Sequence, residues 1–244
     1  MGMADALAAV YDLGAAPTVE PLHGPGINNR VWAVDAGGAS YVLKQYQTHS
    51  RGETILYEHR LLAWLAARPL PFQAPVAQRT RRGETLWWHG RMAYALFPRL
   101  AGAAVWPPAL GHLEQIGAAL AHLHRTLADY PREPRPGLYG YGDLGRVHPA
   151  LPQPERLDTA MLGIEDTGVA QDDLRWWQGE VGRLARFADT VYRRLPQQVI
   201  HGDYAPSNTL FVGGRLAAVV DFDMALPDVR AMDVAAGLTF AMRV

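Results

Sequence analysis

The sequence predicts an α+β fold, in which an antiparallel β-sheet with one main helix precedes a mostly helical half. Short apolar runs separated by turn residues dominate the first part of the chain, and apolar residues at helical spacing follow. The composition changes at Phe97-Pro98, so we expect an N-terminal lobe at 1–97 and a C-terminal lobe at 98–244. A length of 244 residues suits one large domain or two small lobes.

The first half alternates strand and turn signals around a single long helical pattern. Residues 30–35 alternate apolar and polar side chains, as a half-buried strand does, and Gly37-Gly38 is a hairpin signal. This order suits a small antiparallel sheet with one helix packed on it. The expected elements are a helix at 4–14, strands at 18–22, 30–35 and 40–46, a helix at 53–67, and strands near 76–79 and 86–96.

The second half is expected to be mostly helical. Residues 111–128 carry their leucines on one stripe, which predicts an amphipathic helix. Residues 131–156 are rich in proline and glycine, so we expect an irregular segment there. Another helix is expected at 172–195, with the following apolar residues on one side: Leu174, Trp177, Val181, Leu184, Phe187 or Ala188, and Val191.

Composition excludes several classes of protein. The chain has 23 basic and 24 acidic residues, a net charge of −1, which argues against nucleic acid or an anionic membrane as a partner. It has no cysteine, which excludes disulfides, thiolate zinc sites and cysteine nucleophiles. No signal peptide or membrane-length apolar run is recognisable. We therefore expect a cytoplasmic protein that is a monomer or a homodimer.

Two neighbouring loops near the C-terminus carry the most informative side chains. Asp203, Asn208 and Asp221 each follow an apolar, strand-like run, and Gly213-Gly214 forms a turn between the two loops. Phosphoryl transfer from a metal-bound nucleotide needs such a set. One carboxylate orients the acceptor hydroxyl, while an amide and a second carboxylate hold magnesium on the phosphates.

Each of these residues also has a structural interpretation when it is taken alone. Asp203 could cap a turn, and Asn208 could be a turn residue after Pro206. Asp223 could contact the metal through water or bond the loop backbone, and the sequence leaves both readings open. For His201 we favour a scaffolding role in which the ring bonds the backbone.

The motifs resemble those of a known enzyme family. His201-Gly202-Asp203, followed by Asn208, resembles the catalytic loop of the aminoglycoside phosphotransferase and choline kinase-like enzymes, and Val219–Asp223 resembles their metal loop. The resemblance covers roughly residues 18–240. It implies a two-lobed, protein kinase-like fold that uses ATP and Mg²⁺. The implied activity is transfer of the γ-phosphate to a hydroxyl of a small molecule, such as an aminoglycoside, homoserine, choline or a sugar-like acceptor.

The resemblance also implies roles for individual residues. Asp203 is the expected catalytic base, and Lys44 on the third strand is expected to pair with the nucleotide phosphates and with Glu58, with Glu53 as a competing partner. Asp233 corresponds to a helix-starting aspartate that caps the helix or braces the catalytic loop. The expected metal ligands are Asn208, Asp221 and Asp223. The expected phosphate-covering loop contains Gly24, Gly26, Asn28 and Asn29.

Two other functions remain as alternatives. Asp221-Phe222-Asp223 after an apolar strand is also typical of a metal-dependent glycosyltransferase, although that motif normally follows several βα units of a parallel sheet. The other alternative is a non-catalytic nucleotide-binding module with a kinase-like fold. The sequence does not identify which small molecule is the acceptor. Four acidic residues could favour a cationic acceptor or form a solvated turn: Glu165, Asp166, Asp172 and Asp173.

Overall fold

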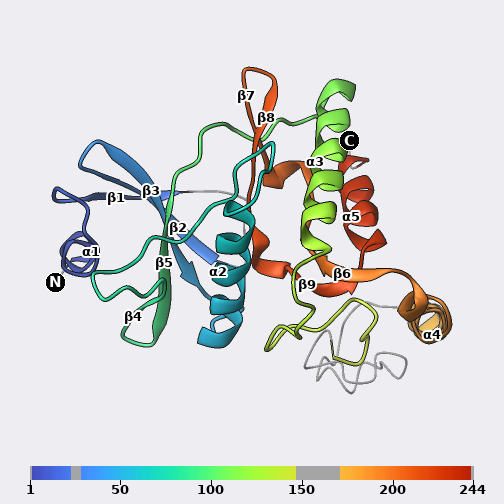
Figure 1. Ribbon diagram of the computed structural model, residues 1–244. Coiled ribbons are helices and arrows are strands. Elements are labelled where there is room, and N and C mark those ends of the chain that lie inside the picture. The colour runs from blue at the N-terminus through green and yellow to red at the C-terminus, as the bar shows by residue number, and fades with distance from the viewer. Residues whose placement is uncertain (1, 23–28, 147–170, 243–244) are drawn as a thin grey trace.

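The computed structural model describes residues 2–22, 29–146 and 171–242 (Figure 1). The first part of the chain forms one antiparallel sheet in the order β1-β2-β3-β5-β4. Its strands are β1 (Thr18–Leu22), β2 (Asn29–Ala36), β3 (Ala39–Tyr46), β4 (Trp87–His89) and β5 (Met92–Pro98). Two helices, α1 (Met3–Val10) and α2 (Gly52–Ala66), lie on opposite faces of this sheet (Figure 1).

The alternation of β3 assigns its residues to the two faces of the sheet. Leu43 packs with Leu7 of α1 in one apolar cluster, whereas Tyr46 packs with Ile55 of α2 in another. Because successive side chains of a strand point to opposite faces, Lys44 lies on the α2 face, next to the rest of the molecule. The Gly37-Gly38 turn joins β2 to β3, with φ values of +59° and +79°.

The second part is mostly helical, as expected, and also carries two small antiparallel strand pairs. Helix α3 (Leu110–Leu127) buries its leucine stripe against the core that also contains Val199 and Val219. The pairs are β6 (Gln197–Ile200) with β9 (Leu226–Val229) and β7 (Thr209–Val212) with β8 (Arg215–Val219). The remaining helices are α4 (Gln171–Thr190) and α5 (Ala231–Ala241).

The strand prediction was wrong at two places between α2 and α3. Residues 86–96 are a hairpin and not one strand, because Gly90 adopts φ +61° and reverses the chain between β4 and β5. Residues 76–79 form no strand. They contribute a single backbone hydrogen bond, from Gln78 N to the Leu96 carbonyl at 2.7 Å. The preceding Pro71 and Pro75 have no backbone donor to extend a ladder.

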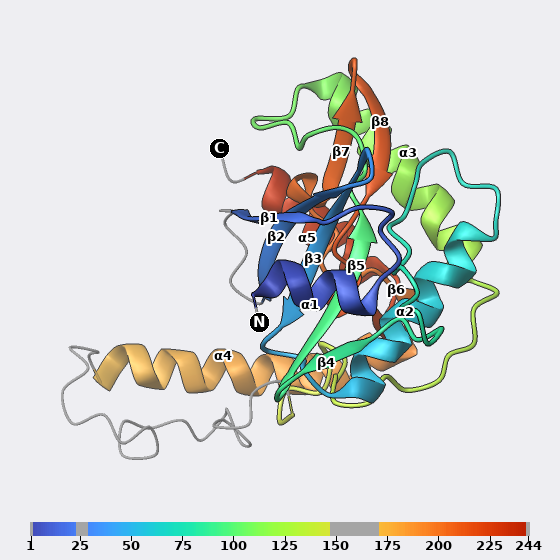
Figure 2. The same ribbon diagram turned by 90° about the vertical axis from the view of Figure 1, so that its left-hand side faces the viewer.

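The prediction for α4 was right in type and too long at the C-terminal end. The helix ends at Thr190, and a 3₁₀ turn at Tyr192–Arg194 follows. Only a narrow stripe of the predicted face is buried, namely Leu174, Val181 and Ala188. The exposed members are Trp177, Leu184, Phe187 and Val191. Figure 2 shows why: the described part of α4 projects away from the body of the molecule.

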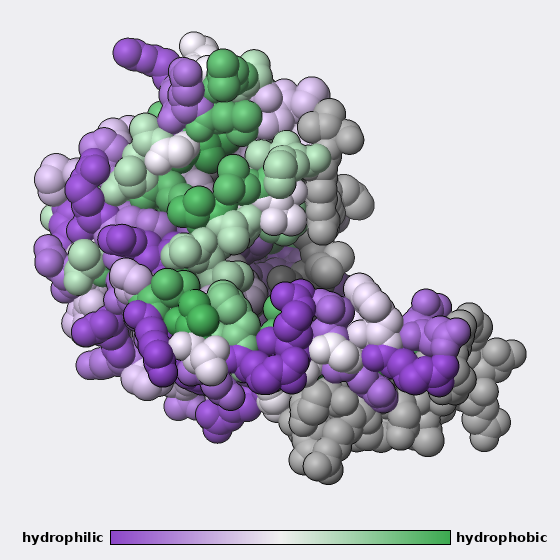
Figure 3. All heavy atoms as spheres, turned by 90° about the vertical axis from the view of Figure 1, so that its right-hand side faces the viewer, coloured by the Kyte–Doolittle hydropathy of each residue, from purple (hydrophilic) through white to green (hydrophobic). Residues whose placement is uncertain are grey.

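An apolar patch covers the face that carries α5. Figure 3 shows hydrophobic side chains gathered there, above the projecting α4. On α5 the exposed apolar residues are Val234, Leu238 and Met242, spaced four apart along one side of the helix. Among the helices of the described residues, none is long and apolar enough to cross a membrane.

A buried histidine in α2 predicts a loss of stability in acid. His59 contacts the Tyr46 hydroxyl at 3.1 Å and Thr85 Oγ1 at 2.8 Å, and burial lowers its pKa to about 3. Below about pH 6.5 the His59 imidazole binds a proton in the unfolded chain but stays neutral in the folded protein. Stability conferred by neutral His59 is therefore present above that pH and lost as the pH falls toward 3. We expect the melting temperature of His59→Gln to fall less steeply between pH 7 and 4 than that of the parent.

The exposed His89 gives the matched control for this experiment. His89→Gln should keep the parental pH slope, because the His89 side chain lies on the surface and its replacement changes no buried group. Equal slopes for His59→Gln and the parent would contradict the assignment of His59 as a group held neutral by burial.

Candidate active site

The predicted catalytic loop, residues 201–208, begins where β6 ends and needs glycine at its second position. Gly202 has φ +81°, and a Cβ atom there would lie 2.1 Å from the Met224 carbonyl oxygen. A side chain would therefore meet the backbone of the metal loop. The close approach of the two backbones brings His201-Gly202-Asp203 next to the turn that follows Asp221.

A buried carboxylate braces this loop from α5. Asp233 accepts hydrogen bonds from the backbone N–H groups of His201, at 2.9 Å, and Gly202, at 2.8 Å, and contacts His124 Nε2 at 2.9 Å. The N-cap position of α5 is Arg230. Of the two roles expected for Asp233, the structure therefore shows the brace and not the cap.

His201 joins the two functional loops. Its Nδ1 accepts from the backbone N–H of Asp203 at 3.3 Å, and its Nε2 donates to the Val220 carbonyl at 3.0 Å. Both ring nitrogens are thus engaged by backbone, and the ring is fully buried. This is the scaffolding arrangement expected for His201, and it sets the distance between the loops that carry Asp203 and Asp221.

Asp203 and Asn208 lie together on the first loop. The Asn208 amide nitrogen donates to the Asp203 carbonyl at 2.8 Å and to Asp203 Oδ2 at 3.3 Å. The backbone N–H of Val220 donates to the Asn208 carbonyl at 2.9 Å and ties this loop to the second one. Because its amide nitrogen is engaged, Asn208 can offer its side-chain oxygen to a cation.

Asp221 has the most unusual backbone in the site. It adopts φ +67° and ψ +62°, and it is the one non-glycine residue of the described chain with positive φ. That conformation costs most residues with a Cβ atom about 1–2 kcal/mol, and aspartate tolerates it better because its short side chain can hydrogen-bond locally. Its side chain is 48% exposed. Burial of its inner part and the neighbouring Asp223 raise the pKa of Asp221.

Lys44 reaches the second loop from the sheet. Its Nζ lies 3.3 Å from Glu58 Oε1 and 3.9 Å from Asp221 Oδ1, and it forms an ion pair with Asp223. Burial opposes the charge of the ammonium group, but the three carboxylates raise the pKa of Lys44 above its ordinary value. The lysine is therefore positioned across from the acidic loop and remains charged.

Glu58 is the helix partner of Lys44, and Glu53 is not. Glu53 is exposed and pairs with Arg51 on the surface, whereas the side chain of Glu58 is 3% exposed. Burial raises the pKa of Glu58 to about 7, although Lys44 favours its ionised form. A carboxylate so placed needs cations close by to stay charged.

Asp223 is engaged in a way that the sequence did not suggest. Its carboxylate pairs with Lys44 and accepts a hydrogen bond from the Asn29 side chain, and the residue is 5% exposed. Burial opposes its ionisation, but Lys44 holds the pKa of Asp223 below its ordinary value. Both contacts come from side chains of the sheet and not from the loop backbone. Asn29 is the first residue of β2, so the sheet contributes two side chains to this carboxylate.

Several predicted site residues cannot be placed. Gly24, Gly26 and Asn28 of the phosphate-covering loop lie outside the described residues, as do Glu165 and Asp166. Asp172 and Asp173 are exposed in the first turn of α4, where Asp172 pairs with Arg175.

Sequence reasoning missed Arg135, which lies in the proline-rich segment after α3. Its guanidinium is buried between α2 and the metal loop, 3.7 Å from Glu58 Oε2. No periodicity or spacing distinguishes this arginine from its exposed neighbour Arg132. The one available signal is that two prolines, Pro134 and Pro136, restrict the chain on either side of it.

The donor atoms of the two loops suit magnesium. In the part of the chain that the structure describes, no three His, Asp or Glu side chains gather as a metal cluster. Asn208 and Asp221 instead provide one neutral and one charged oxygen. Magnesium is typically held by one or two such protein oxygens together with phosphate oxygens and water, so the pair fits a metal that arrives with a nucleotide.

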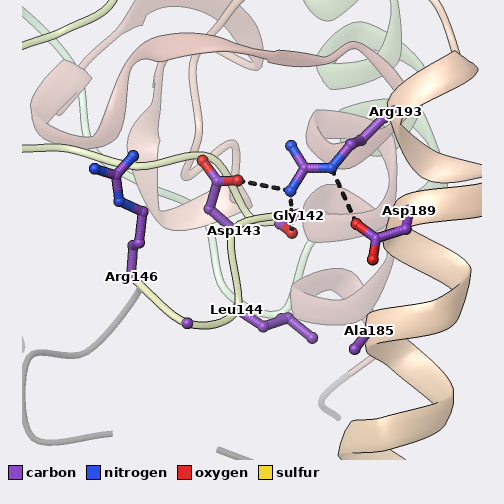
Figure 4. Close-up of a pocket in the computed structure, with 8 residues that line it drawn as sticks. Gly142, Asp143, Leu144, Arg146, Ala185, Asp189 and Arg193 are labelled. Carbon is purple, nitrogen blue, oxygen red and sulfur yellow. Dashed lines mark hydrogen bonds and ion pairs between the residues drawn. The ribbon is translucent and has the colours of Figure 1, made fainter. Parts of the chain in front are cut away.

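A separate pocket of about 290 Å³ lies where the segment after Tyr141 meets α4. Figure 4 shows Arg193 joined to Asp143 and Asp189, at 2.8 and 3.4 Å, with Arg146 on the opposite side. The Tyr141 hydroxyl donates to the Gly202 carbonyl. The segment that lines the pocket is thereby attached to the catalytic loop.

Known proteins resemble the chain in sequence. Residues 18–243 match the profile of the phosphotransferase enzyme family. The homoserine kinase of Phenylobacterium zucineum (strain HLK1) is 29% identical over 233 residues, which cover 95% of this chain and 66% of that protein. The homoserine kinase of Caulobacter vibrioides (strain NA1000 / CB15N) is 30% identical over 231 residues, covering 93% and 67%. The chain thus spans about two thirds of the length of these curated relatives.

Solved structures share the fold. An amicoumacin kinase, hAmiN, in complex with AMP-PNP, Ca²⁺ and amicoumacin aligns with a TM-score of 0.72 at 18% identity, covering 97% of this chain and 67% of that one. A thermostable mutant of the aminoglycoside phosphotransferase APH(4)-Ia with ADP and hygromycin B aligns with a TM-score of 0.58 at 18% identity, covering 95% and 73%. These matches confirm the two-lobed, protein kinase-like α+β fold.

The fold and the sequence matches decide between the family expected from the motifs and its rival. The named strands of the described residues pair antiparallel, which is not the βα framework that a nucleotide-sugar transferase would place before Asp221-Phe222-Asp223. The family profile covers the chain from β1 onward. This protein belongs to the phosphotransferase enzyme family.

Proposed function

We propose that this chain is an ATP-dependent O-phosphotransferase that moves the γ-phosphate of ATP to a hydroxyl of a small molecule. The observation that carries the proposal is the position of Lys44, which lies 3.9 Å from Asp221 and faces the loop next to Asp203 and Asn208. Residues 1–97 would form the nucleotide lobe, and residues 98–244 would carry the catalytic loop. The nucleotide lies between them in this proposal.

Each residue of the site has a defined task. Asp203 holds the acceptor hydroxyl and takes its proton late in the transfer, for which an ordinary carboxylate suffices. Lys44 binds phosphate oxygens and balances their charge, and Glu58 keeps the lysine in place. Asn208 and Asp221 would hold Mg²⁺, which when bound neutralises charge on the phosphates. Asp223 orients Lys44 and does not need to touch the metal.

Homoserine is the first acceptor to test, because curated relatives that match nearly the whole chain are homoserine kinases. The pocket after Tyr141 is our candidate for the acceptor site. It has carboxylates and guanidinium groups within a volume of about 290 Å³, and its backbone continues into Tyr141, which contacts the catalytic loop. A zwitterionic amino acid presents the opposite charges to these groups.

The test is transfer of phosphate from Mg²⁺–ATP to a panel of hydroxyl compounds, with products identified by mass spectrometry. The panel contains L-homoserine, choline, a sugar and an aminoglycoside. We expect a product 80 mass units heavier than L-homoserine, the mass that one added phosphoryl group contributes (about 80 Da). If the protein binds Mg²⁺–ATP tightly and phosphorylates nothing in a broad metabolite mixture, the non-catalytic module replaces this proposal.

A further inference from the structure

A single buried side chain connects the helix that carries Glu58 to the loop that carries Asp221. It is Arg135, from the irregular residues 128–146 that follow α3, and its side chain is 1% exposed. An arginine in such a position must have its donors satisfied, because an unpaired buried guanidinium is strongly destabilising.

Each of the three guanidinium nitrogens of Arg135 lies close to an oxygen atom. Nε donates to the Thr54 carbonyl in the first turn of α2 at 3.1 Å. Nη1 donates to the carbonyls of Phe222, at 3.1 Å, and Ala225, at 2.8 Å, in the turn after Asp221. Nη2 lies 3.7 Å from Glu58 Oε2. A planar group with donors in fixed directions can meet three carbonyls and a carboxylate together, which an ammonium group cannot do.

The backbone around Arg135 is itself fastened to α2. The Thr54 hydroxyl donates to the Pro136 carbonyl at 2.5 Å. Gly137 has φ +77°, and a Cβ atom there would lie 3.1 Å from the same hydroxyl. The segment is therefore attached to the start of α2 directly after Arg135, which fixes the backbone from which the guanidinium reaches the loop after Asp221.

The charges of the cluster show what Arg135 adds. Lys44 and Arg135 face three carboxylates, those of Glu58, Asp221 and Asp223. Glu58 Oε2 is buried and has no hydrogen-bond partner among the residues that the structure describes, and the Arg135 guanidinium lies beside it. Without Arg135, Lys44 alone would face all three carboxylates, and Glu58 would compete with the acidic loop for its ammonium group.

We propose that Arg135 is a positioning residue that holds α2 and the metal loop together, so that Lys44 and Asp221 are placed for one magnesium nucleotide. The inference rests on the proposed function and adds to it a residue that touches neither substrate nor metal. Arg135 acts through the carbonyls of Phe222 and Ala225 on one side and through Thr54 and Glu58 on the other.

The test compares Arg135→Met and Arg135→Lys with a control arginine just beyond the far end of α2. Arg68 also donates to a backbone carbonyl, that of Trp64 at 2.8 Å, but it lies beyond the opposite end of α2 from Thr54. The readouts are the dissociation constant of Mg²⁺–AMP-PNP by calorimetry, the Mg²⁺ concentration for half-saturation, and the melting temperature. Nucleotide binding is measured without an acceptor, so failure to find the acceptor does not affect the result.

We expect Arg135→Met to weaken Mg²⁺–AMP-PNP binding about 10–100-fold, the range seen when groups that orient metal ligands are removed. Arg135→Lys should recover part of that loss, because it restores the charge beside Glu58 but not the three carbonyl contacts. Arg68→Met should bind like the parent. If Arg135→Met does not fold, Arg135→Lys is the test of the proposal. We expect this variant to bind Mg²⁺–AMP-PNP several-fold more weakly than the parent.

Three results would overturn the inference. Parental affinity in folded Arg135→Met is one, and parental affinity in Arg135→Lys when Arg135→Met is unfolded is another. The third is a lower melting temperature with an unchanged dissociation constant, which would mark a purely structural role. If the parent protein binds no magnesium nucleotide, the proposed function is overturned as well. If the parent binds Mg²⁺–AMP-PNP and the Arg135 variants bind it equally well, only the role of Arg135 is overturned.

Discussion

Asp203→Ala is expected to lower kcat by about 10²–10⁴-fold, the contribution typical of a positioned acid or base. The effect should appear in kcat, because the carboxylate meets the acceptor hydroxyl as it reacts and is not needed to hold the nucleotide. Nucleotide affinity should stay close to that of the parent, since the phosphate-facing group is Lys44, which forms its ion pairs with Glu58, Asp221 and Asp223. Single-turnover transfer and equilibrium binding of AMP-PNP measure the two quantities separately.

Asp12→Ala is the matched control for this variant. Asp12 is an exposed aspartate that pairs with Arg81 on the surface at 3.2 Å, far in the sequence from either functional loop. Its removal should change stability by less than about 1 kcal/mol and leave kcat unchanged. Transfer by Asp203→Ala at the parental rate would show that another group receives the proton.

Asp221→Asn is expected to lose most of its transfer activity at the parental Mg²⁺ concentration while remaining folded. Asparagine adopts positive φ readily, so it can take the φ of +67° that Asp221 holds. It loses the charged oxygen that would bind Mg²⁺, and we expect the Mg²⁺ concentration for half-saturation to rise at least about tenfold. Two cations face three carboxylates here, so the metal-free variant should melt no lower than the parent.

Asp221→Ala separates the two contributions of this residue. Alanine lacks both the ligand oxygen and the tolerance for positive φ, so it should lose activity and also about 1 kcal/mol or more of stability. The measurements are a magnesium titration of the transfer rate and thermal unfolding in EDTA. Full activity of Asp221→Asn at the parental Mg²⁺ concentration would remove Asp221 from the metal site.

Local sequence signals were sufficient for most secondary structure. The hairpin at Gly37-Gly38 and the helices α2 and α3 appear within one or two residues of their expected bounds. Such elements depend on turn chemistry and on periodicity within a short window, which the sequence contains in full. The strand prediction was wrong where contacts with a distant segment determine the conformation. Residues 76–79 run beside β5 with one hydrogen bond to Leu96.

Part of the site could likewise be identified from local sequence, and the rest depended on tertiary contacts. The order of His201, Asp203, Asn208 and Asp221 is local, so the sequence alone was enough to identify the two loops and to place Lys44 on the third strand. The choice of Glu58 over Glu53 needed the helix in place, because both lie on α2 and burial separates them. The engagement of Asp223 by Lys44 and Asn29 needed the sheet and the loop together.

By itself, the sequence determined the class of fold, the family and the side chains that could carry phosphoryl transfer, because these follow from short motifs and their order. Only the tertiary structure decided which charges meet. Arg135 is 77 residues from Glu58 in the chain, yet its guanidinium lies 3.7 Å from that carboxylate. No local pattern encodes such a contact, because the energy of a buried ion pair depends on every charge and dipole that folding brings around it.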